Sequence, residues 1–475
     1  MHQSSPTLPV PQSFPQSFEW GVATSSFQIE GDRAGRGETV WDVFCRRPEA
    51  ILDSSNGDVA CDHLRLMADD VRLMADLGLQ SYRFSLAWAR VLPDGVGVPS
   101  PTGLDQYSRL IDLLLEHGIT PVPTLFHWDL PQALEERGGF RSRDSTRWFA
   151  DYAAMMVREF GDRISRWATH NEPWCYSFLG HAAGVHAPGM TDPDAAVSVA
   201  HHLLLGHGLA VQAMRAERDL SLGIVINPAP VHGDDALGAD GVRRIDGTLN
   251  RWFLDPVITG RYPVDVLADM GEWASCVLDG DEAIIGQPLD WLGINYYNDH
   301  FHTGAADVAA VSDGAATAAV AAEVPAPAVP SPHVTAPHSR TRVVDMPHTD
   351  IGWPITPQGF RDMLIGFRDT YGDKLPPIYI TENGAAFSDG LVDGVCDDQR
   401  RVDYLDSHVA AVADAVAAGV DVRGYFAWSL LDNFEWAFGY EQRFGIVHVD
   451  YATQVRTPKA SAHRYAEIIR AARGG

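Results

Sequence analysis

The chain has very little lysine. Lys374 and Lys459 are its only lysines, and neither follows a stretch that is typical of a buried strand. Enzymes that form a Schiff base with their substrate, or that use pyridoxal phosphate, need a buried lysine at the reacting centre. The scarcity of lysine therefore argues against aldolases of the Schiff-base type and against pyridoxal-phosphate enzymes.

Paired cysteine motifs and long apolar runs are also missing. The five cysteines include no CxxC pair and have no disulfide-like spacing, which is typical of reduced thiols in a cytoplasmic protein. Residues 1–16 are polar and proline-rich, without a basic start or an apolar stretch, so we expect a flexible tail rather than a signal peptide. No apolar run approaches the roughly 20 residues of a membrane helix. The cysteines are Cys45, Cys61, Cys175, Cys276 and Cys396.

Positive charge is in short supply. The chain has 36 basic and 63 acidic residues, a formal net charge of −27. A negative surface attracts neither nucleic acid nor an anionic membrane, so we expect neither as a partner. The same charge makes a phosphorylated substrate less favourable. The sequence leaves open a homo-oligomer.

Motifs for cofactors and metals are absent as well. Neither GxGxxG nor GxxxxGK[ST] is apparent, and no HExxH pattern occurs. His201, His202 and His207 cluster on a predicted helix, but no acidic second ligand accompanies them, so we interpret them as structural. The sequence thus predicts no cofactor and no metal.

Eight short apolar runs alternate with amphipathic segments along the chain. This alternation predicts a single-domain (β/α)₈ TIM barrel over residues 17–470, with extended loops at the carboxyl ends of the strands. An Ala/Pro-rich insertion at about 303–339 follows the sixth strand, and we expect a partly flexible rim there. The predicted strands are 19–25, 81–85, 121–126, 167–171, 222–227, 291–295, 378–381 and 422–428.

Polar and aromatic residues follow these strands where a TIM barrel places its active site. Hydroxyl groups of a sugar need amide, imidazole and carboxylate partners, and the apolar face of its ring needs an aromatic platform. Each residue alone has a structural explanation, but together they indicate a site for a neutral sugar. They are Gln28, Arg83, His127, Trp128, Asn171, Glu172, Asn295, Tyr297, Glu382, Trp428, Glu435 and Trp436.

Two glutamates stand at the ends of the fourth and seventh predicted strands. A pair of carboxyl groups across a cleft is the minimal apparatus for glycoside hydrolysis. Glu382 must be ionised to attack the sugar, and Arg83 with the hydroxyl of Tyr297 can stabilise that anion. Glu172 must start protonated, and burial together with the charge of Glu382 would raise its pKa. Asn171 can bind the 2-hydroxyl group.

Asn171-Glu172-Pro173 and Thr381-Glu382-Asn383-Gly384 resemble the acid/base and nucleophile signatures of glycoside hydrolase family 1. The resemblance runs from about Phe18 to about Tyr465. It implies a retaining mechanism through a covalent glycosyl-enzyme, with the carboxyl groups roughly 5–5.5 Å apart. It also implies a cis peptide between Trp428 and Ser429.

The resemblance assigns roles to single residues. It makes Glu172 the acid/base and Glu382 the nucleophile, with Arg83, Asn295 and Tyr297 ordering the nucleophile. We also expect Trp128 and Phe444 to contact substrate. The implied sugar-binding residues are Gln28, His127, Asn171, Trp428, Glu435 and Trp436, with Trp353 on the leaving-group side.

Two features narrow the predicted substrate. Family members that cleave 6-phospho-sugars usually carry serine in place of Glu435, with a lysine nearby. Thioglucosidases of the family usually carry glutamine in place of Glu172. This chain keeps both glutamates and has no lysine near Glu435. The sequence thus predicts a retaining β-glucosidase acting on cellobiose, short oligosaccharides and aryl glucosides. A preference for β-galactosides or β-fucosides stays open, as does a non-catalytic sugar-binding barrel. Trp174 and Leu179 match positions found in glucose-tolerant members.

Overall fold

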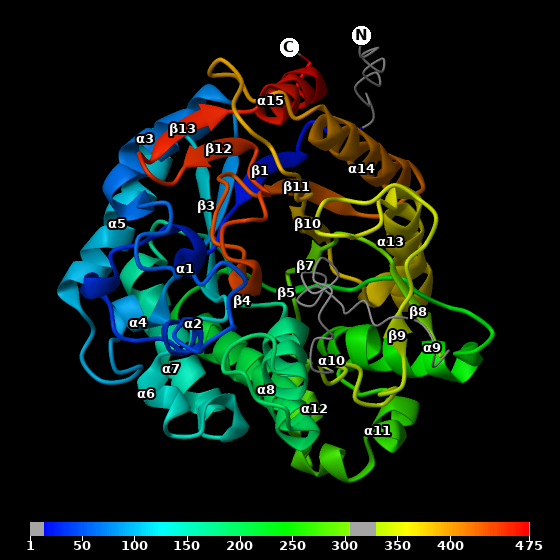
Figure 1. Ribbon diagram of the computed structural model, residues 1–475. Helices are drawn as coiled ribbons and strands as arrows, with labels where there is room; N and C mark the ends of the chain where they lie inside the picture. The colour runs from blue at the N-terminus through cyan, green and yellow to red at the C-terminus, as the bar shows by residue number, and fades with distance from the viewer. Residues whose placement is uncertain (1–13, 305–328, 475) are drawn as a thin grey trace.

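Eight parallel strands close into a barrel in the computed structural model of the chain, which describes residues 14–304 and 329–474 (Figure 1). Around the barrel the order is β1-β11-β10-β7-β5-β4-β3-β2, so neighbours in sequence are neighbours in space. The predicted TIM barrel is confirmed. Its strands are β1 (Glu19–Ala23), β2 (Ser81–Ser85), β3 (Thr120–Phe126), β4 (Arg166–Asn171), β5 (Ser221–Ile226), β7 (Trp291–Asn295), β10 (Ile378–Asn383) and β11 (Val422–Trp428).

Helices form an outer ring around the strands (Figure 1). In α3 one stripe of Met67, Val71 and Met74 is buried, whereas α8 is buried nearly all round between residues 196 and 208. The longer helices are α3 (His63–Asp76), α5 (Pro101–Glu116), α7 (Ser145–Phe160), α8 (Pro193–Glu217), α13 (Pro357–Tyr371), α14 (Gln399–Ala417) and α15 (Ala460–Ala472). The shorter ones are α1 (Ser26–Ile29), α2 (Val40–Cys45), α4 (Trp88–Val91), α6 (Gln132–Glu135), α9 (Gly238–Asp246), α10 (Trp252–Thr259), α11 (Val264–Met270) and α12 (Asp281–Ile285).

Helix starts follow local chemistry only in part. At α5 the Ser100 hydroxyl accepts the N–H of Gly103 at 3.2 Å, and Pro101 takes the first turn, where its missing N–H costs nothing. At α7 the residue before the helix, Asp144, makes no side-chain capping hydrogen bond, and its backbone angles are already helical.

Small sheets and loops extend the barrel beyond its strands. The strands β6 (Val231–Gly233), β8 (His300–Thr303) and β9 (Arg340–Thr341) form a three-stranded sheet. The strands β12 (Val447–Asp450) and β13 (Val455–Pro458) form an antiparallel pair. Most of the predicted insertion, 305–328, lies outside the described residues, but Val334 and Ala336 of its last part are buried.

The predicted tail also lies mostly outside the described residues. Phe14, within that predicted tail, packs against Phe18 and Trp20 with ring centroids 4.3 and 5.0 Å away. The domain boundaries at 17 and 470 stay predictions. Within residues 14–304 and 329–474, no helix has both the length and the apolar character needed to cross a membrane.

Candidate active site

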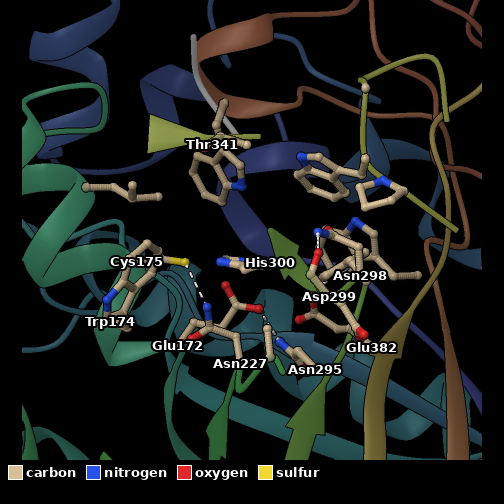
Figure 2. Close-up of a pocket in the computed structure, with 18 of the residues that line it drawn as sticks. Glu172, Trp174, Cys175, Asn227, Asn295, Asn298, Asp299, His300, Thr341 and Glu382 are labelled. Atoms are coloured by element: carbon tan, nitrogen blue, oxygen red, sulfur yellow. Dashed lines mark hydrogen bonds between the residues drawn. The ribbon is translucent and has the colours of Figure 1, made fainter. Parts of the chain in front are cut away.

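A cleft of about 1340 Å³, its open mouth included, lies at the carboxyl ends of the barrel strands (Figure 2). Most of the predicted site residues line it. Gln28, Arg83 and Asn171 do not, because they are fully buried behind the lining. The predicted residues that line the cleft are His127, Trp128, Glu172, Asn295, Tyr297, Trp353, Glu382, Trp428, Glu435, Trp436 and Phe444.

Glu172 is aimed into the cleft by an irregular strand end. The register between β4 and β5 shifts between Ala168 and Asn171. The Glu172 backbone then adopts φ +45°, and its N–H donates to the carbonyl of Val225 at 2.9 Å. A left-handed conformation is uncommon for a residue with a side chain and is typical of functional sites. The irregularity turns the carboxyl group away from the strand's regular alternation.

Glu382 is aimed by a similar irregularity in β10. The register with β7 shifts between Ile380 and Glu382, which pairs with Asn295. The chain needs glycine at 384, because a Cβ there would lie 1.7 Å from the carbonyl oxygen of Trp428. The peptide between Trp428 and Ser429 is cis, which confirms that expectation.

A cation and a phenol surround the Glu382 carboxyl group. Arg83 Nη1 lies 2.5 Å from Glu382 Oε1, and the Tyr297 hydroxyl donates to Oε2 at 2.7 Å. Burial raises the pKa of Glu382, while Arg83 and Tyr297 oppose that rise by stabilising the anion. Burial also raises the pKa of Tyr297 well above its usual value, so its phenol stays protonated and keeps donating.

Within residues 14–304 and 329–474, no cation contacts the Glu172 carboxyl group. Its partner is the Asn295 amide, whose Nδ2 donates to Oε1 at 2.7 Å. Burial and then the negative charge of Glu382 raise the pKa of Glu172 to about 8, against hydrogen bonds from Asn295 and Cys175. Of the two glutamates at the strand ends, Glu172 is therefore the one that holds a proton at neutral pH.

A network of amides ties the two glutamates together. Asn295 Nδ2 also donates to Asn171 Oδ1 at 3.0 Å, and Arg83 Nη2 donates to the same oxygen at 2.7 Å. Thr381 Oγ1 donates to Asn295 Oδ1 at 2.7 Å, which fixes the orientation of that amide. Because one guanidinium contacts both Glu382 and Asn171, movement at either strand end is coupled to the other.

His127 extends this network toward the cleft. Its Nε2 lies 3.1 Å from Asn171 Nδ2, so that nitrogen accepts the amide proton. Burial, followed by the charge of Arg83, lowers the pKa of His127 well below its usual value. The imidazole is thus neutral, and its other nitrogen can donate to a sugar hydroxyl.

A third carboxyl group, Glu435, lines the cleft near the pair. Burial, then the charges of Glu382 and Glu172, raise the pKa of Glu435 to about 8. Gln28 Nε2 lies 3.5 Å from Glu435 Oε2 but donates more closely to the carbonyl of Phe434, at 2.8 Å. Gln28 therefore contacts the backbone beside Glu435, and its contact with sugar stays a prediction.

Aromatic rings form the walls of the cleft. Trp128 and Trp436 lie with ring centroids 4.6 Å apart, and Trp353 lies 5.9 Å from Phe444. The Trp428 ring is nearly parallel to His127, at 6.0 Å and 17°. Flat rings beside donors and acceptors suit a pyranose.

Several lining residues were not among those predicted. Asn227, directly after β5, donates from Nδ2 to Cys175 Sγ at 3.4 Å (Figure 2). The rule that polar residues at strand ends face the site would have found it. Asp299 and Phe301 follow the sixth barrel strand, whereas no sequence signal indicated Arg342. Trp174 and Leu179 also line the cleft.

The barrel and its paired buried carboxyl groups define a glycosidase of the (β/α)₈ class. The sequence of residues 10–473 matches the sequence profile of glycosyl hydrolase family 1, so the chain belongs to that family. It is 45% identical over 461 residues to thermostable β-glucosidase B of Thermobispora bispora, covering 96% of this chain and 91% of that protein. It is 41% identical over 480 residues to the bifunctional β-D-glucosidase/β-D-fucosidase of Bifidobacterium breve, covering 96% and 98%.

Solved structures agree with this assignment. The crystal structure of the psychrophilic β-glucosidase BglU from Micrococcus antarcticus superposes with a TM-score of 0.92 at 45% identity, covering 97% of this chain and 98% of that one. The β-glucosidase from Thermotoga maritima in complex with deoxynojirimycin superposes with a TM-score of 0.86 at 38% identity, covering 97% and 99%.

Proposed function

We propose that the protein is a retaining β-glucosidase that hydrolyses terminal β-D-glucosyl residues. The observation that carries this proposal is the unequal pair of buried carboxyl groups. Glu382 contacts a guanidinium and a phenol, whereas Glu172 contacts an amide and has its pKa raised to about 8. One carboxylate and one carboxylic acid facing the same cleft are what a retaining glycosidase needs at neutral pH.

In the first step Glu382 attacks the anomeric carbon and Glu172 gives its proton to the departing oxygen. The carbon–oxygen bond to the leaving group breaks, and an ester forms between the sugar and Glu382. Asn171 is buried behind the cleft lining, and Arg83 and Asn295 both donate to its amide oxygen. Binding of the 2-hydroxyl group, whose hydrogen bonds strengthen in the transition state, would therefore fall to its Nδ2.

In the second step the roles of Glu172 reverse. The negative charge of Glu382 disappears in the ester, so the repulsion that raises the pKa of Glu172 is lost. Glu172 then takes a proton from water as the water oxygen attacks the anomeric carbon. The bond between that carbon and Glu382 breaks, so the Glu382 carboxylate is restored and the sugar leaves with its original configuration.

Neutral glucosides suit this cleft better than phosphorylated ones. Glu435 lines the cleft beside Trp436, buried and with its pKa raised to about 8, so a 6-phosphate would meet an acid that offers it no positive charge. Ionisation of that acid would add repulsion. We propose cellobiose, short cello-oligosaccharides and aryl glucosides as substrates, which would place the enzyme in cellulose degradation. A side activity on β-fucosides is favoured by the bifunctional relative from Bifidobacterium breve, and we also expect some β-galactosidase activity.

Further properties are proposed on narrower grounds. We infer a cytoplasmic location, supported by the five free cysteines. Tolerance of glucose is supported by Trp174 and Leu179 in the cleft wall, and strong inhibition by low-millimolar glucose would contradict it. Assembly into a homo-oligomer stays a prediction.

The test is release of 4-nitrophenol from its β-glucoside, β-fucoside, β-galactoside and 6-phospho-β-glucoside, with Glu382→Ala as control. We expect turnover of the glucoside that the substitution abolishes. Turnover of the phospho-sugar alone would contradict the role given to Glu435. Sugar binding without turnover of any substrate would favour the non-catalytic alternative.

A further inference from the structure

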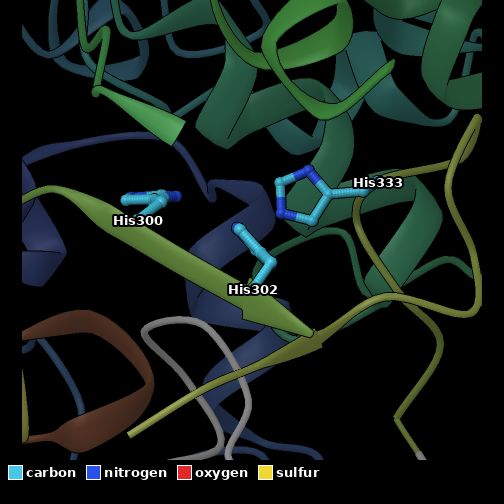
Figure 3. A group of neighbouring side chains, drawn as sticks. All are labelled: His300, His302 and His333. Atoms are coloured by element: carbon cyan, nitrogen blue, oxygen red, sulfur yellow. The ribbon is translucent and has the colours of Figure 1, made fainter. Parts of the chain in front are cut away.

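Three histidines come together beside the cleft, and one of them, His300, lines its wall. His300 and His302 belong to β8, and His333 belongs to the loop that leads toward β9. One side-chain nitrogen from each lies within 4.8 Å of the other two (Figure 3). His302 and His333 are buried, and their rings lie 4.9 Å apart at 89°.

The strand geometry explains why two of the three share a face. Residues two apart on a strand point to the same side, so His300 and His302 project together while Phe301 projects to the other side. There Phe301 stacks on His232 at 4.6 Å. The strand β8 lies between β6 and β9 in its sheet, so its backbone is held on both edges.

His333 is fixed from its own side. It lies in a tight turn in which the Ala336 N–H donates to the His333 carbonyl at 2.9 Å. Its ring lies 5.9 Å from Trp174, which lines the cleft, and 4.9 Å from His302. The third imidazole is thus brought to the strand pair by the fold, from 31 positions further along the chain.

We propose that His300, His302 and His333 form a binding site for a transition-metal ion of the Zn²⁺ class. Imidazole nitrogens favour zinc, copper and nickel over magnesium and calcium, which prefer oxygen. Three histidines with an open fourth position form a ligand set that zinc accepts. The net charge of −27 also favours the approach of a cation.

The distances are compatible with closure on an ion. Zinc lies about 2.0–2.1 Å from each histidine nitrogen, so two nitrogens on one tetrahedral ion lie about 3.4 Å apart. A spread of up to 4.8 Å therefore needs ring movements of roughly 1 Å. His300 is only partly buried and lines the cleft, so its ring has room to turn. An ion here changes the charge of the wall beside the candidate active site.

The histidines at 201, 202 and 207, which the sequence predicts to be structural, are arranged differently. His201 Nε2 lies 2.9 Å from Asp281 Oδ2, His202 Nδ1 lies 2.8 Å from the Phe140 carbonyl, and His207 Nδ1 lies 2.7 Å from Thr169 Oγ1. These three form separate hydrogen bonds and do not converge.

The test is metal binding by the whole protein after treatment with a chelator. Titration with Co²⁺ should give a visible absorption band that saturates at one ion per chain, and Zn²⁺ should displace it. Calorimetry should show Zn²⁺ affinity at least about tenfold weaker in His302→Ala and in His333→Ala. His338→Ala, an exposed histidine on the same loop, should bind like the unaltered protein.

His300→Ala is the alternative variant if substitution of the buried His302 or His333 impairs folding, because His300 is partly exposed. It should also weaken Zn²⁺ binding at least about tenfold. The absence of a saturable Co²⁺ band in the unaltered protein would overturn the proposal. So would Zn²⁺ affinity that is the same in all the variants.

Discussion

The two strand ends that carry Glu172 and Glu382 have similar backbone irregularities but different side chains around the carboxyl group. Each follows a shift in strand register, and each holds a buried glutamate on the same cleft. Beside Glu382 stand Arg83 and Tyr297, while beside Glu172 stands the Asn295 amide. Both residues are buried glutamates, so neither residue type nor burial distinguishes them. Their neighbours therefore decide which of the two holds a proton at neutral pH.

Replacement of Glu382, the attacking carboxylate, should have the largest effect of any substitution at the two strand ends. Glu382→Gln keeps the shape of the side chain but cannot form the ester, so kcat should fall on the order of 10⁴- to 10⁶-fold. Steady-state hydrolysis of 4-nitrophenyl β-glucoside measures this. A variant that kept a tenth of the activity would show that another group attacks.

Replacement of the proton donor should have a smaller effect that depends on the leaving group. In Glu172→Gln we expect kcat/KM for cellobiose to fall about 10²- to 10⁴-fold. A dinitrophenyl glucoside needs little help from an acid in the first step and should lose much less kcat/KM. Equal losses for both substrates would contradict the assignment of Glu172 as the acid.

Loss of one stabiliser of the anion should shift the pH profile. The Tyr297 hydroxyl lowers the pKa of Glu382, so Tyr297→Phe should raise that pKa and move the acid limb of kcat/KM to higher pH. A hydrogen bond to a charged group contributes about 1.5–3 kcal/mol, so the rate should fall roughly 10- to 100-fold.

Tyr296→Phe is the matched control for that variant. Its hydroxyl bonds to Asp299 and Thr356 and not to Glu382. The acid limb should stay in place in this control. If the limb moved equally in both variants, the shift would reflect general disturbance of the loop.

The smallest expected effect concerns Cys175 beside Glu172. Its hydrogen bond lowers the pKa of Glu172, so Cys175→Ala should raise that pKa. Glu172 then keeps its proton to higher pH, and the alkaline limb near pH 8 should move upward. We expect a shift of less than about one pH unit, since a thiol is a weak hydrogen-bond donor. Cys175→Ser keeps a donor and should leave the limb unchanged, while a downward shift in Cys175→Ala would contradict this role.

Much of the barrel could be predicted because its strands are short apolar runs with local signals. The strands at 81–85, 291–295 and 422–428 begin and end as predicted. The eight strand ends then meet at one face by topology alone, which is why Glu172 and Glu382 were expected together.

Other features depend on contacts that no local pattern carries. The Gln28 amide is held by Asn433 and Phe434, which are about 400 positions away, so its place behind Glu435 could not be foreseen. Arg342 reaches the cleft only because β9 pairs with β8. The register shifts that orient the two glutamates depend on pairing with neighbouring strands, so the sequence of either strand alone does not predict them.

In the proposed mechanism Glu382 is the residue that bonds to the sugar. Incubation with 2-deoxy-2-fluoro-β-glucosyl fluoride slows release of the sugar more than its transfer, so the ester accumulates. Intact-mass and peptide mass spectrometry should find one 2-deoxy-2-fluoroglucosyl group per chain, attached to Glu382. A label on Glu172 or Glu435, or steady turnover of the reagent with no labelled enzyme, would contradict the account.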